Sequence, residues 1–92
     1  MRPMARLVFT SQLRRFLAAP ELLCSASTLR QALQQAFDGN PRLAGYVLDD
    51  QGHLRANVVV FIDGRRCTDR ITLGDALGAD STVHVMQALS GG

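Results

Sequence analysis

The sequence predicts an α+β domain in which one main helix crosses one face of a mixed sheet of four to five strands. Two observations support this fold class. Apolar segments typical of strands lie near both ends of the chain and in its second half, and one segment between them has the apolar spacing of a helix. The 92 residues, 47% of them hydrophobic, suffice for one core. We therefore expect a single domain over residues 1–88 and a flexible tail over residues 89–92.

The first two strands are expected to form a hairpin. The stretch ARLVFT is rich in β-formers and places Leu7 and Phe9 on one side. The following SQLRRFLAAP breaks this alternation and ends in a turn, after which ELLCSA returns as an antiparallel strand.

The main helix follows this hairpin. Thr28 and Gln31 have capping-box spacing, and Gly39 lies where the pattern stops, just before an Asn-Pro pair. The apolar positions form one helical stripe: Leu29, Ala32, Leu33, Ala36 and Phe37. A helix of at most three turns is unstable alone, so this stripe is expected to pack on the sheet.

The second half of the chain supplies the remaining strands. An irregular or single-turn piece is expected around Leu43 and Tyr46, followed by an extra hairpin near residues 47–56. The run VVVFI is apolar on both faces, as in a central strand with the helix on one side and a loop or a partner on the other.

A hairpin turn at Asp63-Gly64 leads to a short strand in RRCTDR, and a connector leads to the closing strand TVHVMQA. If the first and last strands pair in the centre, this order is a β-grasp (ubiquitin-like) arrangement.

Composition argues against several classes of function. All ten basic residues are arginines scattered along the chain, the net charge is +2, and there is one Tyr and no Trp, so no nucleic-acid groove is expected. No stretch has the ~20 apolar residues of a membrane span, and no signal peptide is evident, so we expect a cytoplasmic protein without a membrane partner.

No catalytic or metal site is predicted. Cys24 is expected to be a small buried hydrophobe and Cys67 an incidental thiol, while His53 and His84 lack partners at ligand or triad spacing and are expected on the surface. The acidic residues fall mostly in turns and at the ends of elements, and no pair has a spacing that favours acid–base work. The chain is therefore expected not to be an enzyme.

The closing strand runs into the glycine pair Gly91-Gly92, for which we expect neither the role of a helix cap nor that of a hairpin turn. With glycine at ~7% of residues, such a pair occurs by chance in about 0.5% of chains, so it calls for a functional explanation beside that of a frayed tail.

Four segments resemble the ubiquitin-like sulfur carriers, the family that includes the small subunit of molybdopterin synthase and the thiamin-pathway carrier. They are STLRQALQQAF, NPRLAGYVLDDQGHLRANVVVFIDGRR, LGDAL and VHVMQALSGG. The most specific parts are Asp63-Gly64 and Ser90-Gly91-Gly92, and the extra hairpin resembles the longer carriers. Gln87 replaces the proline usual in the molybdopterin branch, and GADS at 78–81 replaces its Asp-Gly-Asp turn, so these departures argue against that branch.

The resemblance implies a function for the tail. In these carriers a ubiquitin-activating-like adenylyltransferase uses ATP and magnesium to adenylate the terminal carboxylate, here that of Gly92. A sulfur donor then forms a thiocarboxylate, which a downstream synthase accepts; the carrier itself binds no cofactor. Gly92 has no β-carbon to obstruct attack, and Leu89, Ser90 and Gly91 form the slim tail that enters the partner.

A docking surface is also expected. If the valines of the closing strand pack beneath the helix, His84 and Met86 face outward. The resemblance places Met86 at a partner contact and Arg14 at a basic one. If Val58, Val60 and Ile62 are the core residues of their strand, we expect Val59 to extend the patch. An ordinary core position for Met86 and a solvated side chain for Arg14 are the alternatives.

Three functions fit the sequence. The favoured one is a sulfur carrier for a cofactor or another sulfur-containing metabolite, with the small subunit of molybdopterin synthase as a special case. The second is a protein modifier conjugated through Gly92, and the third is a plain binding module.

Overall fold

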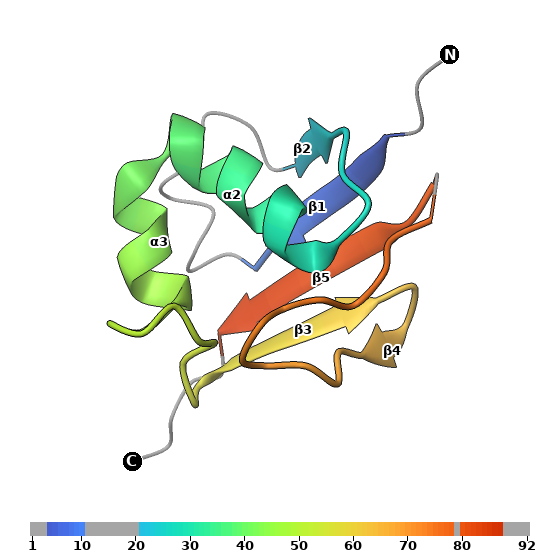
Figure 1. Cartoon of the computed structure of the whole chain (residues 1–92). Coiled ribbons are helices and arrows are strands. Elements are labelled where there is room, and N and C mark those ends of the chain that lie inside the picture. Colours follow the sequence, from blue (N-terminus) through green and yellow to red (C-terminus); the bar gives the residue numbers. More distant parts are fainter. Residues whose placement is uncertain (1–3, 11–20, 79, 88–92) are drawn as a thin grey trace.

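A five-stranded mixed sheet forms the centre of the molecule, with the strand order β2-β1-β5-β3-β4 (Figure 1). The computed structural model describes residues 4–10, 21–78 and 80–87. Its strands are β1 (Ala5–Phe9), β2 (Glu21–Cys24), β3 (Val58–Ile62), β4 (Arg65–Arg66) and β5 (Thr82–Gln87). β1 and β5 are parallel, whereas the other neighbouring strands are antiparallel. The first and last strands thus lie side by side in the centre, which confirms the predicted β-grasp arrangement.

The main helix, α2 (Leu29–Gly39), begins where the sequence predicted. The Thr28 hydroxyl accepts a hydrogen bond from the Gln31 N–H at 3.3 Å, and the Gln31 side chain accepts one from the Ser27 N–H at 2.9 Å. The first bond satisfies a backbone donor that the first turn of a helix leaves free, and the second ties the residue before the cap to that turn. The helix ends at Asn40, whose N–H donates to the carbonyls of the last turn.

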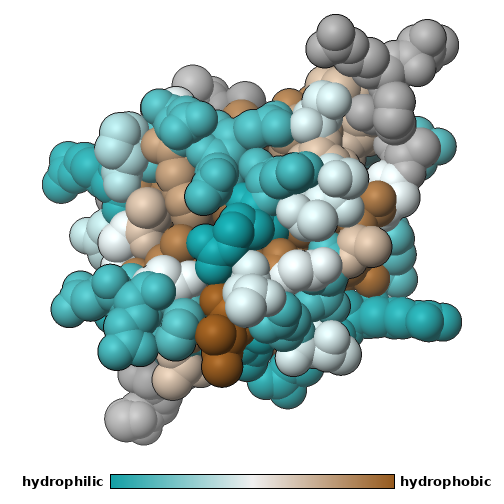
Figure 2. Space-filling view, in the orientation of Figure 1, coloured by the Kyte–Doolittle hydropathy of each residue, from teal (hydrophilic) through white to brown (hydrophobic). Residues whose placement is uncertain are grey.

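The core lies between α2 and one face of the sheet, and Figure 1 shows the helix crossing that face. The helical stripe is buried at Leu29, Ala32, Leu33 and Ala36. The facing strand residues are fully or almost fully buried: Leu7, Phe9, Val58, Val60, Val83 and Val85. Figure 2, in the same orientation, shows mainly hydrophilic residues on this side, with hydrophobic ones in small separate areas. Most hydrophobic residues on this side of the sheet are therefore buried in the core and not exposed on the surface.

A second helix, α3 (Pro41–Val47), replaces the irregular or single-turn piece predicted around Leu43 and Tyr46, so that prediction is wrong. Proline is well suited to the first helical position, where its missing N–H costs nothing. Leu43 and Val47 lie one helical turn apart and are both fully buried. Their burial stabilises a helix too short to be stable alone.

Cys67 is also part of the core, with 6% of its surface exposed, so its prediction as an incidental thiol is wrong. Its N–H donates to the Val60 carbonyl at 2.8 Å, so the pairing with β3 continues one residue beyond β4. This pairing directs the Cys67 side chain to the face of the sheet that α2 covers. Burial raises the pKa of the Cys67 thiol, and burial likewise raises the pKa of Cys24. Both cysteines therefore behave as small apolar residues.

The connector between β4 and β5 is ordered by the side chain of Asp69. This carboxylate accepts hydrogen bonds from the N–H groups of Ile71, Thr72 and Gly74 and from the Thr72 hydroxyl. Leu73, in the same loop, is fully buried with a left-handed φ of 58°. The hydrogen bonds, led by that of the Thr72 hydroxyl, hold the pKa of Asp69 well below its usual value.

Asp69 should therefore contribute to stability in a pH-dependent way. A carboxylate with a depressed folded pKa stabilises fully above its unfolded pKa of about 4, and this contribution is lost as the pH falls toward the folded value. We expect Asp69→Asn to lower the Tm at pH 7, since an amide cannot accept all four bonds. The Tm difference from the unmodified chain should shrink as the pH falls below about 4. Thermal unfolding followed by circular dichroism tests this, and a difference independent of pH would contradict it.

Candidate functional site

The predicted tail residues, Leu89, Ser90, Gly91 and Gly92, lie outside the residues that the structure describes, and so does Arg14. What the structure shows is the strand from which the tail continues. β5 ends at Gln87, in the centre of the sheet.

The end of β5 is held from both sides. Gln87 pairs with Val58 in the antiparallel ladder to β3. On the other side its N–H donates to the Thr10 hydroxyl at 3.4 Å, and the Thr10 N–H donates to the Val85 carbonyl at 3.1 Å. Two neighbouring segments therefore hold Gln87, the last described residue before the tail.

The two faces of β5 differ as predicted. Val83 and Val85 are fully buried beneath α2, whereas His84 and Met86 are exposed on the opposite side, which we call the outer face. Met86 has 40% of its surface exposed, so it is no ordinary core residue. Val59 lies directly opposite Met86 in the register of β3 and β5 and is half-buried. The three described residues of the predicted partner surface are thus neighbours on one face.

Two further residues belong to this surface and were missed from the sequence. Phe61 pairs with His84 from β3, and Val8 pairs with the same histidine from β1. Both are half-buried. The alternation that places Phe9 inside already places Val8 outside, and the step of two from Val59 reaches Phe61. We define the outer-face patch as Val8, Val59, Phe61, His84 and Met86.

Charged residues flank the outer-face patch. Arg66 lies opposite Phe61 in the β3–β4 register and is exposed, and its side chain makes no hydrogen bond or ion pair with any described residue. On the β2 side, Arg6 Nε lies 3.2 Å from Glu21 Oε1, with both side chains about half exposed. Arg66 is therefore available to an acidic group on a partner, whereas Arg6 already has an acidic neighbour.

The patch is suited to protein contact. It combines apolar and aromatic side chains with an arginine at its edge, as protein interfaces do. Within the described ranges, no three His, Cys, Asp or Glu residues come together as a metal site would need. The described helices are also too short to span a bilayer.

Comparisons with solved structures show what this fold resembles. Small archaeal modifier protein 1 (SAMP1) from Haloferax volcanii matches with a TM-score of 0.83 and 21% identity, over 97% of this chain and 99% of that chain. A chain of the BexX/CysO complex of Amycolatopsis orientalis matches with a TM-score of 0.82 and 11% identity, over 96% and 99%. Urm1 from Trypanosoma brucei matches with a TM-score of 0.71 and 17% identity, over 98% and 96%.

No protein-family model matches the chain, and no curated protein matches it in sequence. Each structural match covers nearly the full length of this chain and of the matched chain. The chain therefore has the ubiquitin-like β-grasp fold that these solved structures share. At these identities the similarity concerns the fold.

Proposed function

We propose that this protein is a sulfur carrier that is loaded at the carboxylate of Gly92. The observation that supports it most is the position of β5. This strand carries Met86 and His84 of the outer-face patch, is held in the sheet as far as Gln87, and continues in the sequence to Gly91-Gly92. A partner that docks on the patch would thus contact the strand from which the tail continues in the sequence.

The chemistry belongs to the partners in this proposal. A ubiquitin-activating-like adenylyltransferase, with ATP and magnesium, converts the carboxylate to an acyl-adenylate and releases pyrophosphate. A sulfur donor then displaces AMP from the Gly92 carbonyl, which leaves a thiocarboxylate. A downstream synthase then takes the sulfur for a cofactor or another metabolite. Attack at the Gly92 carbonyl needs room for the nucleophile and the leaving group, which a residue without a β-carbon provides. The chain itself acts as a co-substrate and not as a catalyst.

Conjugation to proteins is the second candidate. The similarity to the small archaeal modifier protein of Haloferax volcanii favours it, because that protein is named as a modifier. Both functions share the activation of Gly92, so the two differ only in whether a sulfur donor or a lysine amine attacks. The small subunit of molybdopterin synthase is less favoured, because Gln87 replaces the expected proline.

Intact-mass spectrometry tests this proposal. The chain is incubated with a ubiquitin-activating-like adenylyltransferase from the same genome, ATP, magnesium and a sulfide source. We expect one oxygen of the chain to be replaced by sulfur. Adducts of the chain on lysine amines of another protein in the mixture would support the modifier function instead, and an unchanged mass would contradict both functions.

Met86 should matter for docking and not for folding. We expect Met86→Asp to weaken binding to the activating partner by about tenfold or more, because a charge would be buried in the apolar centre of the interface. The Tm should stay nearly unchanged, since Met86 is exposed. Leu23→Asp is the matched control, because Leu23 lies on the same face, in β2, and is 62% exposed. Isothermal titration calorimetry measures both variants, and equal losses of affinity would contradict the assignment of the patch.

A further inference from the structure

The two arginines of β4 face opposite sides of the sheet. Arg66 pairs with Phe61 on the outer face, and Arg65 pairs with Ile62 on the side of α2. This arrangement follows from the alternation of side chains along a strand. Arg65 therefore lies apart from the outer-face patch and needs an explanation of its own.

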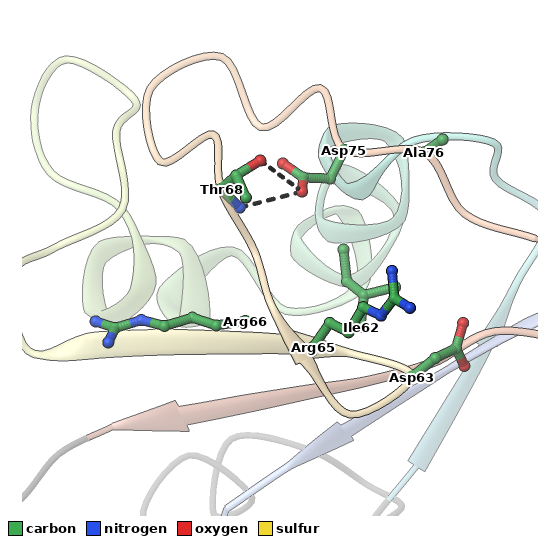
Figure 3. Close-up of a pocket in the computed structure, with 7 residues that line it drawn as sticks. All are labelled: Ile62, Asp63, Arg65, Arg66, Thr68, Asp75 and Ala76. Carbon is green, nitrogen blue, oxygen red and sulfur yellow. Dashed lines mark hydrogen bonds between the residues drawn. The ribbon is translucent and has the colours of Figure 1, made fainter.

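Arg65 lines a cavity of about 550 Å³ between the β3–β4 hairpin and the connector that follows it (Figure 3). The lining residues are Ile62, Asp63, Arg65, Arg66, Thr68, Asp75 and Ala76. In Figure 3 the guanidinium of Arg65 lies beside Ile62, whereas the side chain of Arg66 extends away from the other labelled residues. The cavity thus contains one inward cation next to an apolar wall.

The two carboxylates of the cavity already accept hydrogen bonds from other residues of the chain. Asp75 accepts hydrogen bonds from the Thr68 N–H and hydroxyl at 3.1 and 3.2 Å, and from the Asp69 N–H at 3.0 Å. These contacts close the loop after β4. If Asp75 turned toward Arg65, it would give up three hydrogen bonds for one exposed ion pair, which is worth little.

Asp63 is held in the same way, at the turn between β3 and β4. Its two oxygens accept from the Thr82 N–H and from the Ser81 hydroxyl, each at 2.9 Å. These hydrogen bonds, led by that of Thr82, hold the pKa of Asp63 below its usual value, so Asp63 stays ionised and tied to β5. The side chain of Arg65 accordingly makes no hydrogen bond or ion pair with any of the described residues.

We infer that the cavity binds the carboxylate of an aspartate or glutamate side chain on a partner protein. The guanidinium of Arg65 offers paired N–H donors that match a carboxylate, and Ile62 and Ala76 contact the apolar part of the incoming segment. The fixed negative charges of Asp63 and Asp75 oppose a phosphate dianion more strongly than a carboxylate, which favours the protein side chain. This inference does not depend on the sulfur-carrier proposal.

NMR titration of the isotope-labelled chain tests the inference. The probe is the end-capped peptide acetyl-Leu-Glu-Leu-amide, and the control is acetyl-Leu-Gln-Leu-amide, which has the same shape without the charge. We expect saturable shifts at the Arg65 Nε–H and at the amides of Thr68 and Ala76 with the first peptide, and binding about threefold or more weaker with the second. Equal binding of the two peptides, or no saturable shift with either, would overturn the inference.

A pair of variants separates Arg65 from its neighbour. Arg65→Gln should remove the response to the acidic peptide, and Arg66→Gln should keep it. Both residues are exposed, so neither change should lower the Tm, which circular dichroism checks. A response that survives Arg65→Gln would overturn the assignment. Inorganic phosphate that binds at Arg65 at lower concentration than the peptide would overturn the choice of a protein carboxylate.

Discussion

Replacing Phe9 with alanine should lower the free energy of unfolding by about 3–5 kcal/mol, which is a large part of the stability of a small domain. Phe9 lies in the central strand β1, pairs with Val85 of β5, and has 1% of its surface exposed. Truncation removes a whole ring from the core and leaves a cavity that two paired strands cannot easily close. Urea unfolding followed by circular dichroism measures the loss.

Phe61→Ala is the matched control. It removes the same ring from the opposite face of the sheet, the outer face, where Phe61 is half-buried. We expect a loss of less than half of that for Phe9, since less apolar surface returns to water. Equal losses would mean that the outer face is as well covered as the core, and would contradict its assignment as a docking surface.

Much of the fold, including the buried position of Phe9, could be predicted from the sequence. Alternation in β1 and β5 placed Leu7, Phe9 and the two valines inside, because one face of each strand is buried and the other is not. The cap at Thr28 and the helical stripe were equally clear, since both are local patterns that the helix needs by itself. The sequence of these elements along the chain was enough to predict the β-grasp fold.

The missed features depend on contacts between distant segments. The seven residues of α3 form a helix because Leu43 and Val47 reach the core, which no local pattern predicts. Cys67 is buried because it follows the two-residue strand β4 and still pairs with β3, which turns its side chain toward the core. A strand of two residues is too short to show an alternating pattern in the sequence. Propensity is a weak guide where tertiary packing decides.

The candidate site was predictable to the same extent. The outward direction of His84 and Met86 followed from the closing strand alone. That Val8 and Phe61 lie next to His84 could not be predicted from single strands. It depends on the register of two strand pairs, the parallel pair β1–β5 and the antiparallel pair β3–β5. Strand pairing, and not the composition of any single strand, makes this surface continuous.

Deleting Gly92 should abolish loading of the chain, with a loss of at least about 100-fold in the rate of adenylation by the activating partner. Removal of one residue draws the carboxylate back by roughly 3.5 Å, and a displacement of only about 1 Å can cost 100-fold in a reaction that depends on position. The new carboxylate would belong to Gly91, so the chemical group is kept and only its reach is changed. Pyrophosphate exchange with ATP measures the adenylation step directly.

The control for this deletion is Gly39→Ala. Gly39 ends α2, is exposed, and has open space where a Cβ would be added, so alanine there should leave both the fold and the loading intact. In the proposal Gly92 acts through its carboxylate and adds nothing to the core, so the deletion should leave the Tm unchanged while loading is lost. Loading that survives the deletion would show that the reactive group is not the carboxylate of Gly92. A large drop in Tm would instead mean that the tail supports the fold, and the effect on loading would then be indirect.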